Sequence, residues 1–330
     1  MIAFGMSDSV DRLISFTEKI LTRRKRRREI KRFKQQQKNV IIDWLEAFIW
    51  AAFVVLLINQ YLLQAYQIPS GSMIRTLLIG DRIFVNKLVY GPEMIPGYGK
   101  VSGFDTPERN DVLIFENPSY IGKGPVFDIA QRVIYMLTLS LVDIDRDEYG
   151  QPRDHFLIKR AVGDSGDQFR ISGGEMVIRP RGEREWMDET AFKTLSGNQY
   201  ETIRAISPDD YDTIRAAGGA LARRDLALPA EPDDQAYISA LQAMRYLDPF
   251  ELEYQRQRLY YAAVPDDLQS RRRLQFIRAG WYVPENHIFP MGDNRDNSRD
   301  GRYFGAVPDR KVLGRAIFVY WPLQRFGAIR

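Results

Sequence analysis

The longest apolar stretch of the chain occupies residues 44–63 and reads WLEAFIWAAFVVLLINQYLL. A helix of about 20 mainly apolar residues is long enough to cross the ~30 Å hydrocarbon core of a bilayer. Its polar residues Glu46, Asn59 and Gln60 stand near the two ends, where side chains can reach the membrane interface. The pattern therefore predicts a transmembrane anchor over residues 44–64.

Two other interpretations of this stretch stay open. Its uninterrupted apolar centre, residues 47–58, is short enough to be a buried core helix. A cleaved signal peptide is the second alternative, but the stretch is followed by Ala65-Tyr-Gln-Ile-Pro69 rather than by a clear Ala-x-Ala site. We therefore favour an uncleaved anchor.

Beyond the anchor the pattern changes to short runs of β-branched and apolar residues separated by Gly, Pro, Asn and Asp, which is typical of strands and turns. The runs cover residues 82–89, 112–115, 156–162, 176–178 and 312–321. They predict a mostly β chain whose main domain, residues 65–330, is built on an antiparallel sheet.

Residues 207–279 break this strand pattern. They are rich in Ala, Leu, Arg, Gln and Glu at amphipathic spacing, which favours helices. Ser207-Pro208 and Asp248-Pro249 each place a good N-cap residue before a proline at the first helical position. We expect a helical insertion between two strands of the β domain.

A second apolar run, residues 133–142, is too short to cross a bilayer. It fits either a core element of the domain or an amphipathic piece that touches the outer leaflet. Of these two interpretations we favour the core element.

The charge of the chain is unevenly distributed. Residues 23–38 hold ten Lys/Arg and one Glu, so the rest of the chain is net negative although the whole carries +4. By the positive-inside rule, this block places residues 1–43 in the cytoplasm and residues 65–330 on the far side of the membrane. It would also bind anionic membrane lipids. The alternative is a solvated or nucleic-acid-binding arm; because an apolar run follows the block, we expect no nucleic-acid partner.

Composition excludes several kinds of site. The chain has no cysteine, which rules out disulfides, thiolate metal sites and cysteine nucleophiles. It has two histidines, His155 and His287, which leaves little material for a Ser-His-Asp triad and makes histidine-rich metal sites unexpected.

Two serines, Ser70 and Ser72, flank Gly71 shortly after the anchor. A serine hydroxyl is a weak nucleophile and needs an adjacent base, a role that a neutral lysine amine can fill. If Gly71 lets the chain turn tightly, the Ser72 amide and the Ser70 hydroxyl are plausible donors to an oxyanion. Taken alone, Ser-Gly-Ser is a common loop tripeptide.

The candidate base is Lys159, which lies among apolar residues in the predicted strand 156–162. Burial disfavours an ammonium and lowers the pKa of a lysine. Strand alternation allows Lys159 to point inward while Arg160, on the opposite face, meets a carboxylate. Without this context, a Lys-Arg pair in a strand more commonly marks a solvated face.

Together these motifs resemble bacterial type I signal peptidases, the leader peptidases with a serine–lysine dyad. The matching stretches are Ile68-Pro-Ser-Gly-Ser-Met73, Thr76-Leu-Leu-Ile-Gly-Asp81, Val85-Asn-Lys87, Ile158-Lys-Arg-Ala-Val-Gly-Asp164 and Gly292-Asp-Asn-Arg-Asp-Asn-Ser298, with Asp300, Arg302 and Gly305. They cover some forty residues, in the order of the family, downstream of an N-terminal anchor.

The resemblance implies a role for each matching residue. Ser72 would be the nucleophile, Lys159 the general base and Ser70 an oxyanion donor, while Ser298 would orient the lysine amine. Three further residues would support the site: Gly292 by permitting close approach, and Asp300 and Arg302 as a charge pair. The shallow pockets for small residues would be lined by Ile68, Pro69 and Ile158.

The implied fold is a mostly β, antiparallel catalytic core of signal-peptidase type, with a helical insertion and an N-terminal transmembrane helix. The resemblance also implies that neither a metal nor a cofactor is needed. The implied activity is that of a membrane-anchored serine endopeptidase that removes N-terminal signal peptides from secreted preproteins after small residues. Its partners would be membrane lipids and the signal peptides of Sec- or Tat-exported preproteins. The expected location is the bacterial inner membrane, with one span.

The chain departs from the family pattern at Arg75, where members commonly have proline. Residues 207–279 map onto no family motif, and one span is found where many members have two. Two other functions stay open: a serine hydrolase with His155 or His287 as base, and a non-catalytic membrane-anchored binding protein on the same fold. The second would predict a broken dyad, whereas Ser72 and Lys159 are both present.

Overall fold

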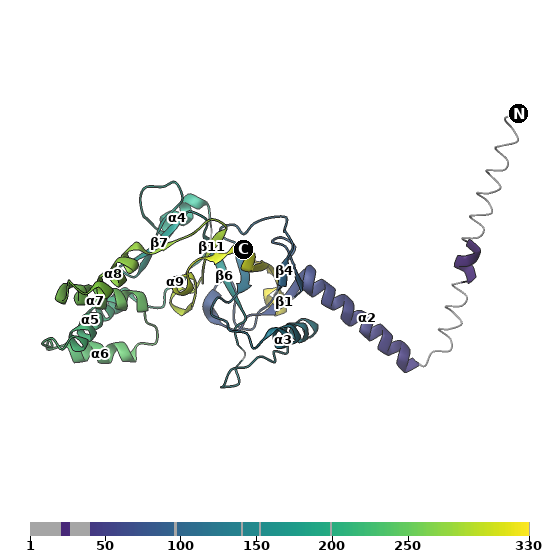
Figure 1. Ribbon diagram of the computed structural model, residues 1–330, viewed down its shortest axis with the longest axis horizontal. Coiled ribbons are helices and arrows are strands. Elements are labelled where there is room, and N and C mark those ends of the chain that lie inside the picture. Colours follow the sequence, from purple (N-terminus) through teal and green to yellow (C-terminus); the bar gives the residue numbers. More distant parts are fainter. Residues whose placement is uncertain are drawn as a thin grey trace, which may run out of the picture. The chain divides into compact units, whose positions relative to one another are not determined.

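The computed structural model divides into two units, residues 1–55 and 56–330, which we describe separately (Figure 1). The described residues are 21–26, 40–95, 98–139, 141–151, 153–198 and 200–329. Most of the segment expected to be cytoplasmic, residues 1–43, lies outside them.

The first apolar stretch forms one helix, α2 (Val40–Tyr61). Among the described residues it is the one helix that is long and apolar enough to cross a membrane, with a mean hydropathy of 2.2. Its last turn differs from the expected one, because Asn59 and Gln60 are buried. The Gln60 side chain donates to the Glu93 carbonyl at 2.8 Å. These polar residues therefore contact protein rather than a membrane interface.

The second unit is built around an eight-stranded antiparallel sheet that curls. Its strand order is β1 (Leu63–Gln67), β2 (Arg82–Asn86), β13 (Val312–Trp321), β5 (Val112–Glu116), β6 (Phe156–Gly163), β11 (His287–Met291) and β12 (Val307–Pro308), with β14 (Gly327–Ala328) paired to β13. A four-stranded sheet has the order β10 (Trp281–Tyr282), β7 (Gln168–Ser172), β8 (Glu175–Arg179) and β9 (Met187–Asp188). A two-stranded sheet pairs β3 (Glu93–Ile95) with β4 (Tyr98–Lys100).

The strands form where the sequence supplies apolar residues for the core. Ile83 and Val85, two residues apart on β2, are fully buried, as period-two alternation requires. Residues 112–115 of β5 are buried on both faces, because this strand lies in the middle of the sheet. The five predicted strands are confirmed as β2, β5, β6, β8 and β13, although β2 ends at Asn86.

The described part of the chain is mixed rather than mostly β, since helices hold 41% of its residues and strands 22%. Besides α2, the helices are α3 (Pro125–Leu137), α4 (Glu189–Ser196), α5 (Pro208–Asp225), α6 (Asp234–Ala243), α7 (Pro249–Ala263), α8 (Leu268–Ala279) and the short α9 (Gly301–Phe304). The expectation of a mostly β chain is wrong for the share of residues in helices, because α3 and α4 were not predicted and α5–α8 are long.

Helices α5–α8 form a group of their own beside the smaller sheet (Figure 1). Both predicted N-caps are confirmed: the Ser207 hydroxyl accepts from the Asp210 amide, and the Asp248 carboxylate accepts from the Phe250 amide. Small residues let α5 and α7 pack closely, since a Cβ on Gly218 would lie 2.9 Å from the Leu252 carbonyl oxygen.

The second apolar run divides between the core and the surface. Residues up to Leu137 belong to α3, and Met136 is buried against the sheet domain. The side chains of Leu137, Leu139, Leu141 and Val142 are exposed. The expectation of a core element is therefore wrong for this second half, because the helix ends before the apolar residues do.

Candidate active site

The turn that carries Ser72 is a short 3₁₀ helix, Gly71–Met73, a few residues after β1. The Ser72 carbonyl accepts from the Asn294 amide at 3.0 Å, and the Asn294 side chain donates to the Gly71 carbonyl at 3.1 Å. Gly71 does not have a positive φ, but a Cβ there would lie 2.8 Å from the Ile74 side chain. A side chain at position 71 would therefore displace Ile74. The turn is held by Asn294, which lies in the matching stretch Gly292–Ser298 but was given no role there.

Lys159 lies on β6, which contacts this turn. Its Nζ lies 2.9 Å from Ser72 Oγ and donates to the Ile158 carbonyl at 2.8 Å. The side chain is 3% exposed, and this burial lowers the pKa of Lys159 to about 8, although the carboxylates of Asp300 and Asp154 oppose the shift. A useful fraction of the amine is therefore neutral near pH 8.

Arg160 points to the other face of β6, and its predicted carboxylate partner is Asp293. The guanidinium donates to both Asp293 oxygens, at 2.9 and 2.8 Å, and neither side chain is exposed. Thr76 joins the pair, because its hydroxyl donates to Asp293 at 2.6 Å and accepts from Arg160 at 2.9 Å. One buried network therefore connects all three sequence motifs directly behind Lys159.

Asp300 organises the loop that closes the site. Its carboxylate accepts from the Gly292 amide at 3.0 Å and from the Arg302 guanidinium at 2.9 Å. Burial would raise the pKa of Asp300, but the Arg302 charge and these hydrogen bonds hold it below its usual range. The charge pair predicted from the sequence is thus present, and it fixes the start of α9.

Ser298 lies near the Ser72 turn, next to Gly292. Among the hydrogen bonds of the described residues, none joins Lys159 Nζ to Ser298. A Cβ on Gly292 would lie 2.2 Å from Ser298 Oγ and 2.7 Å from the Ser72 carbonyl oxygen. A side chain at position 292 would therefore push this loop away from the nucleophile.

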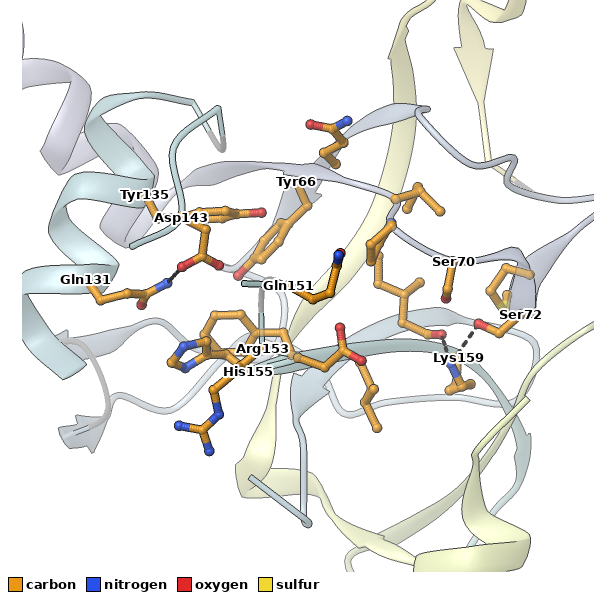
Figure 2. Close-up of a pocket in the computed structure, with 18 of the residues that line it drawn as sticks. Tyr66, Ser70, Ser72, Gln131, Tyr135, Asp143, Gln151, Arg153, His155 and Lys159 are labelled. Atoms are coloured by element: carbon orange, nitrogen blue, oxygen red, sulfur yellow. Dashed lines mark hydrogen bonds between the residues drawn. The ribbon is translucent and has the colours of Figure 1, made fainter. Parts of the chain in front are cut away.

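A cavity of about 490 Å³ opens over the dyad (Figure 2). It is lined by Ser72 and Lys159 together with all the residues expected to contact substrate or oxyanion, namely Ile68, Pro69, Ser70 and Ile158. The Ser70 side chain is exposed into this space, whereas Ile68 is 3% exposed and forms part of its floor. A peptide that enters the cavity meets apolar walls on the side where small residues are expected.

Neither histidine is placed to act on the nucleophile. His155 lies in the same cavity, but its Nε2 is 2.8 Å from the buried Asp145 carboxylate. The His287 ring lies 2.8 Å from the Glu285 carbonyl, outside the cavity lining. The basic group beside Ser72 is the Lys159 amine, which disfavours a histidine-based hydrolase.

Comparison with known proteins agrees with this geometry. Residues 41–321 match the family model described as signal peptidase, peptidase S26. The chain belongs to the signal peptidase family, peptidase S26. Signal peptidase I of Pseudomonas fluorescens is 28% identical over 88% of this chain and 76% of its own length. Signal peptidase I of Aquifex aeolicus is 27% identical over 81% of this chain and 79% of its own length.

As a member of the signal peptidase family, the protein is a membrane-anchored serine peptidase that cleaves signal peptides. Relatives also occur outside bacteria. A probable chloroplastic thylakoidal processing peptidase of Arabidopsis thaliana is 22% identical over 88% of this chain and 47% of its own length. Within the described residues, no cluster of three or more His, Asp or Glu side chains could hold a metal.

At Arg75, where the chain departs from the signal peptidase pattern, the backbone conformation also excludes proline. Arg75 has a φ of +87°, in the left-handed region, and follows Ile74 in a tight turn. Proline cannot adopt this conformation, because its ring fixes φ near −65°. The Arg75 side chain is 64% exposed and lies 3.8 Å from Glu201, and both residues line a cavity other than that of the dyad.

Proposed function

We propose that Ser72 is the nucleophile and Lys159 the general base of this signal peptidase, which cuts preproteins after small residues. The observation that carries the proposal is the 2.9 Å separation of Lys159 Nζ and Ser72 Oγ. A serine hydroxyl needs a neighbouring base, and burial of Lys159 lowers its pKa to about 8, so that the neutral amine is populated.

In the first step Lys159 accepts the Ser72 proton while Oγ attacks the scissile carbonyl carbon. The lysine ammonium then gives this proton to the leaving amine, which frees the mature protein and leaves an acyl-enzyme. In the second step Lys159 takes a proton from water while the water oxygen attacks the acyl carbonyl carbon. The ester bond to Ser72 Oγ then breaks, Oγ takes the proton back from the lysine ammonium, and the signal peptide leaves as a carboxylic acid. The same amine thus serves first as base and then as acid in each half of the reaction.

The remaining site residues support these steps. The Ser72 amide and the Ser70 hydroxyl would donate to the oxyanion, a role consistent with the exposure of Ser70 into the cavity. Ser298 would orient the lysine amine once substrate excludes water, with Gly292 allowing its close approach. Asp300 and Arg302 would hold this loop in register through their ion pair.

Small residues would be selected by the apolar surface of Ile68, Pro69 and Ile158. These side chains line the cavity next to Ser72, and Ile68 is itself buried, so the surface is shallow and rigid. Large side chains before the cut would meet this floor before the scissile carbonyl reached Ser72 Oγ.

The membrane arrangement is part of the proposal. Residues 1–43 would be cytoplasmic, residues 44–64 would form the single anchor, and residues 65–330, with the helical insertion 207–279, would lie outside the cytoplasm. The basic block before an apolar helix supports this orientation. The simplest location is a bacterial inner membrane, where preproteins exported by the Sec and Tat systems present their signal peptides beside lipid.

The test uses detergent-solubilised full-length protein and a preprotein with an Ala-x-Ala site. We expect the wild type to cut after the second alanine, and Ser72→Ala and Lys159→Ala to lose this cleavage. His155→Ala should retain it, since His155 contacts Asp145 instead. Cleavage by Lys159→Ala would contradict the assigned base, and loss of cleavage in His155→Ala alone would favour a histidine-based mechanism.

A further inference from the structure

The loop that closes the active site is held by the segment that leads into the helical insertion. This loop, residues 292–300, follows β11, and its Asn294 holds the Ser72 turn. We call it the closing loop. The segment that holds it, residues 200–206, lies between α4 and α5, and we call it the strap.

The backbone of the strap pairs with the closing loop at Asn294. Ile203 and Asn294 form an isolated parallel bridge. The Ile203 amide donates to the Asp293 carbonyl at 2.9 Å, and the Ile203 carbonyl accepts from the Arg295 amide at 3.0 Å. Between these two bonds, the Asn294 amide donates to the Ser72 carbonyl at 3.0 Å. Three successive residues of the closing loop therefore connect the strap to the nucleophile turn.

The Asp296 side chain makes a second attachment. Its carboxylate accepts from the amides of Ala205 and Ile206, at 2.6 and 3.0 Å. It also accepts from Arg204 Nε at 3.1 Å, and the Asp296 side chain is 3% exposed. Charge-assisted hydrogen bonds of this kind are strong, and several on one buried carboxylate fix its direction as well as its position. Asp296 therefore attaches the closing loop to the last residues of the strap.

The strap is itself anchored in the helical insertion. Ile206 is 6% exposed and belongs to an apolar cluster that includes Tyr211 of α5. The Arg204 guanidinium also donates to the Tyr211 hydroxyl. This hydroxyl donates to Asp248, the N-cap residue of α7, at 3.1 Å. A continuous polar path thus leads from the closing loop through Arg204 to the starts of α5 and α7.

The insertion also contacts the chain just beyond the closing loop. Phe250 of α7 packs against Tyr303 of α9, with ring centroids 4.9 Å apart. Helix α9 begins at its cap residue Asp300, whose carboxylate accepts from the Gly292 amide at the other end of the loop. The insertion therefore supports the closing loop in its middle, at Asp296, and at its end.

We propose that Asp296 is a positioning residue through which the helical insertion holds the closing loop against the Ser72 turn. Arg204 is its partner in this role. Asp296 is not among the described residues that line the cavity over the dyad, so it acts through Asn294, which bonds the turn. This inference rests on the proposed function of the dyad and gives the insertion a part in the same reaction.

The surroundings of Lys159 provide a readout that separates positioning from folding. Burial, the largest effect, lowers the pKa of Lys159, whereas the carboxylates of Asp300, Asp154 and Asp293 raise it. Asp293 and Asp300 belong to the closing loop, so a shift of the loop admits water to the amine. Its pKa then rises towards the ordinary value of 10.5. Partial unfolding instead lowers the rate by one factor at every pH, because the molecules that stay folded keep their pKa.

The test measures kcat/KM of the full-length protein in detergent on one preprotein with an Ala-x-Ala site, from about pH 6 to about pH 10. The variants are Arg204→Ala, Asp296→Asn and the two combined. Arg204→Lys is the conservative variant, because a lysine keeps the charge beside Asp296. The matched control is Arg215→Ala, which removes a guanidinium 3.1 Å from the buried Glu251 inside the insertion. Denaturant unfolding gives the stability of every variant.

We expect Arg204→Ala and Asp296→Asn each to lower kcat/KM about tenfold near neutral pH, because a displaced nucleophile reacts slowly. Each should also move the pH of half-maximal kcat/KM upward from about 8. The combined variant should lose little more than either alone, since both changes remove one contact. Arg204→Lys should return the half-maximum towards that of the wild type. Arg215→Ala should lower stability by a similar amount and leave the half-maximum unchanged.

A loss of kcat/KM by one factor at every pH, with an unmoved half-maximum, would show a loss of folded protein and overturn the positioning role. An equal shift in Arg215→Ala would overturn it as well, because the effect would then follow from general destabilisation. Unchanged kinetics in Arg204→Ala and Asp296→Asn would show that their contact does not position the loop. These three results leave the proposed function standing, whereas no cleavage by the wild type at any pH would reject both.

Discussion

The domain contains two buried lysines whose surroundings differ. Lys159 and Lys87 are 3% and 2% exposed, and burial lowers the pKa of each to about 8. By accessibility and proton affinity the two amines are therefore alike. A lowered lysine pKa is a consequence of burial and does not by itself identify a catalytic base.

Their neighbours separate them. Lys159 Nζ lies beside Ser72 Oγ, under a cavity of about 490 Å³. Lys87 Nζ donates to the Gln64 side chain at 3.2 Å, beside a cavity of about 10 Å³, and its amide donates to the Leu62 carbonyl. A cavity of this size holds about one water and no peptide. The Lys87 amine meets a side chain of the neighbouring strand β1, whereas the Lys159 amine meets a nucleophile beside substrate space.

The most direct test of the difference between the two lysines replaces each amine in turn. Lys159→Met should lower kcat/KM by a factor on the order of 10³ or more, because the general base is removed. Lys87→Met should retain activity within about tenfold, since its amine contacts no reacting group. Both values come from cleavage of the same preprotein. Loss of activity in Lys87→Met, with a folded protein, would contradict the distinction.

The next largest effect concerns the support behind Lys159. Asp293→Ala leaves the buried Arg160 guanidinium without its carboxylate, so we expect the free energy of unfolding to fall by about 3–5 kcal/mol. The matched control is Glu201→Ala, which removes an exposed partner of Arg75 and should cost at most about 1 kcal/mol. Denaturant unfolding in detergent measures both. Equal effects of the two variants would show that the Asp293 pair adds no support.

The pH dependence tests which lysine controls activity. Only neutral Lys159 accepts the Ser72 proton, so kcat/KM should rise about tenfold per pH unit below its pKa of about 8 and level off above it. In Lys87→Met the rise of kcat/KM with pH should occur over the same pH range as in the wild type. If Lys87→Met shifted this part of the pH profile, the titration that controls activity would belong to Lys87 and not to Lys159.

The same pKa values predict the stability of the domain. In the unfolded chain both lysines have a pKa near 10.5, so between about pH 8 and 10.5 the unfolded state binds more protons than the folded state. The contribution of these lysines to stability therefore rises with pH in this window. Lys159→Met and Lys87→Met should each reduce the rise, as measured by denaturant unfolding at several pH values.

The smallest effect concerns the turn that follows the nucleophile. Arg75→Gly should raise the free energy of unfolding by about 1 kcal/mol or less, because glycine accepts a positive φ without steric cost. Arg75→Pro should lower it, since proline cannot reach +87°. Thermal unfolding of the two variants checks the sign. Stabilisation by proline would contradict the left-handed turn.

Local patterns in the sequence predicted much of this molecule. The apolar stretch predicted helix α2, and Ser207 and Asp248 marked helix starts, because caps and periodicity depend on residues within about one helical turn. Alternation along β6 predicted that Arg160 would meet a carboxylate. Helix α3 was missed because its residues read as an apolar run, whose second half is in fact exposed.

Sequence alone determined which groups were available: two serines around Gly71, a lysine in an apolar strand, and no cysteine. Only the tertiary structure decided that Asp293 pairs with Arg160, that Asn294 holds the Ser72 turn, and that Lys159 rather than Lys87 meets the serine. These contacts join residues far apart in the chain, so they depend on how the sheet curls and not on any local pattern. Burial acts on both lysines alike, whereas reactivity requires a particular neighbour, which the fold alone supplies.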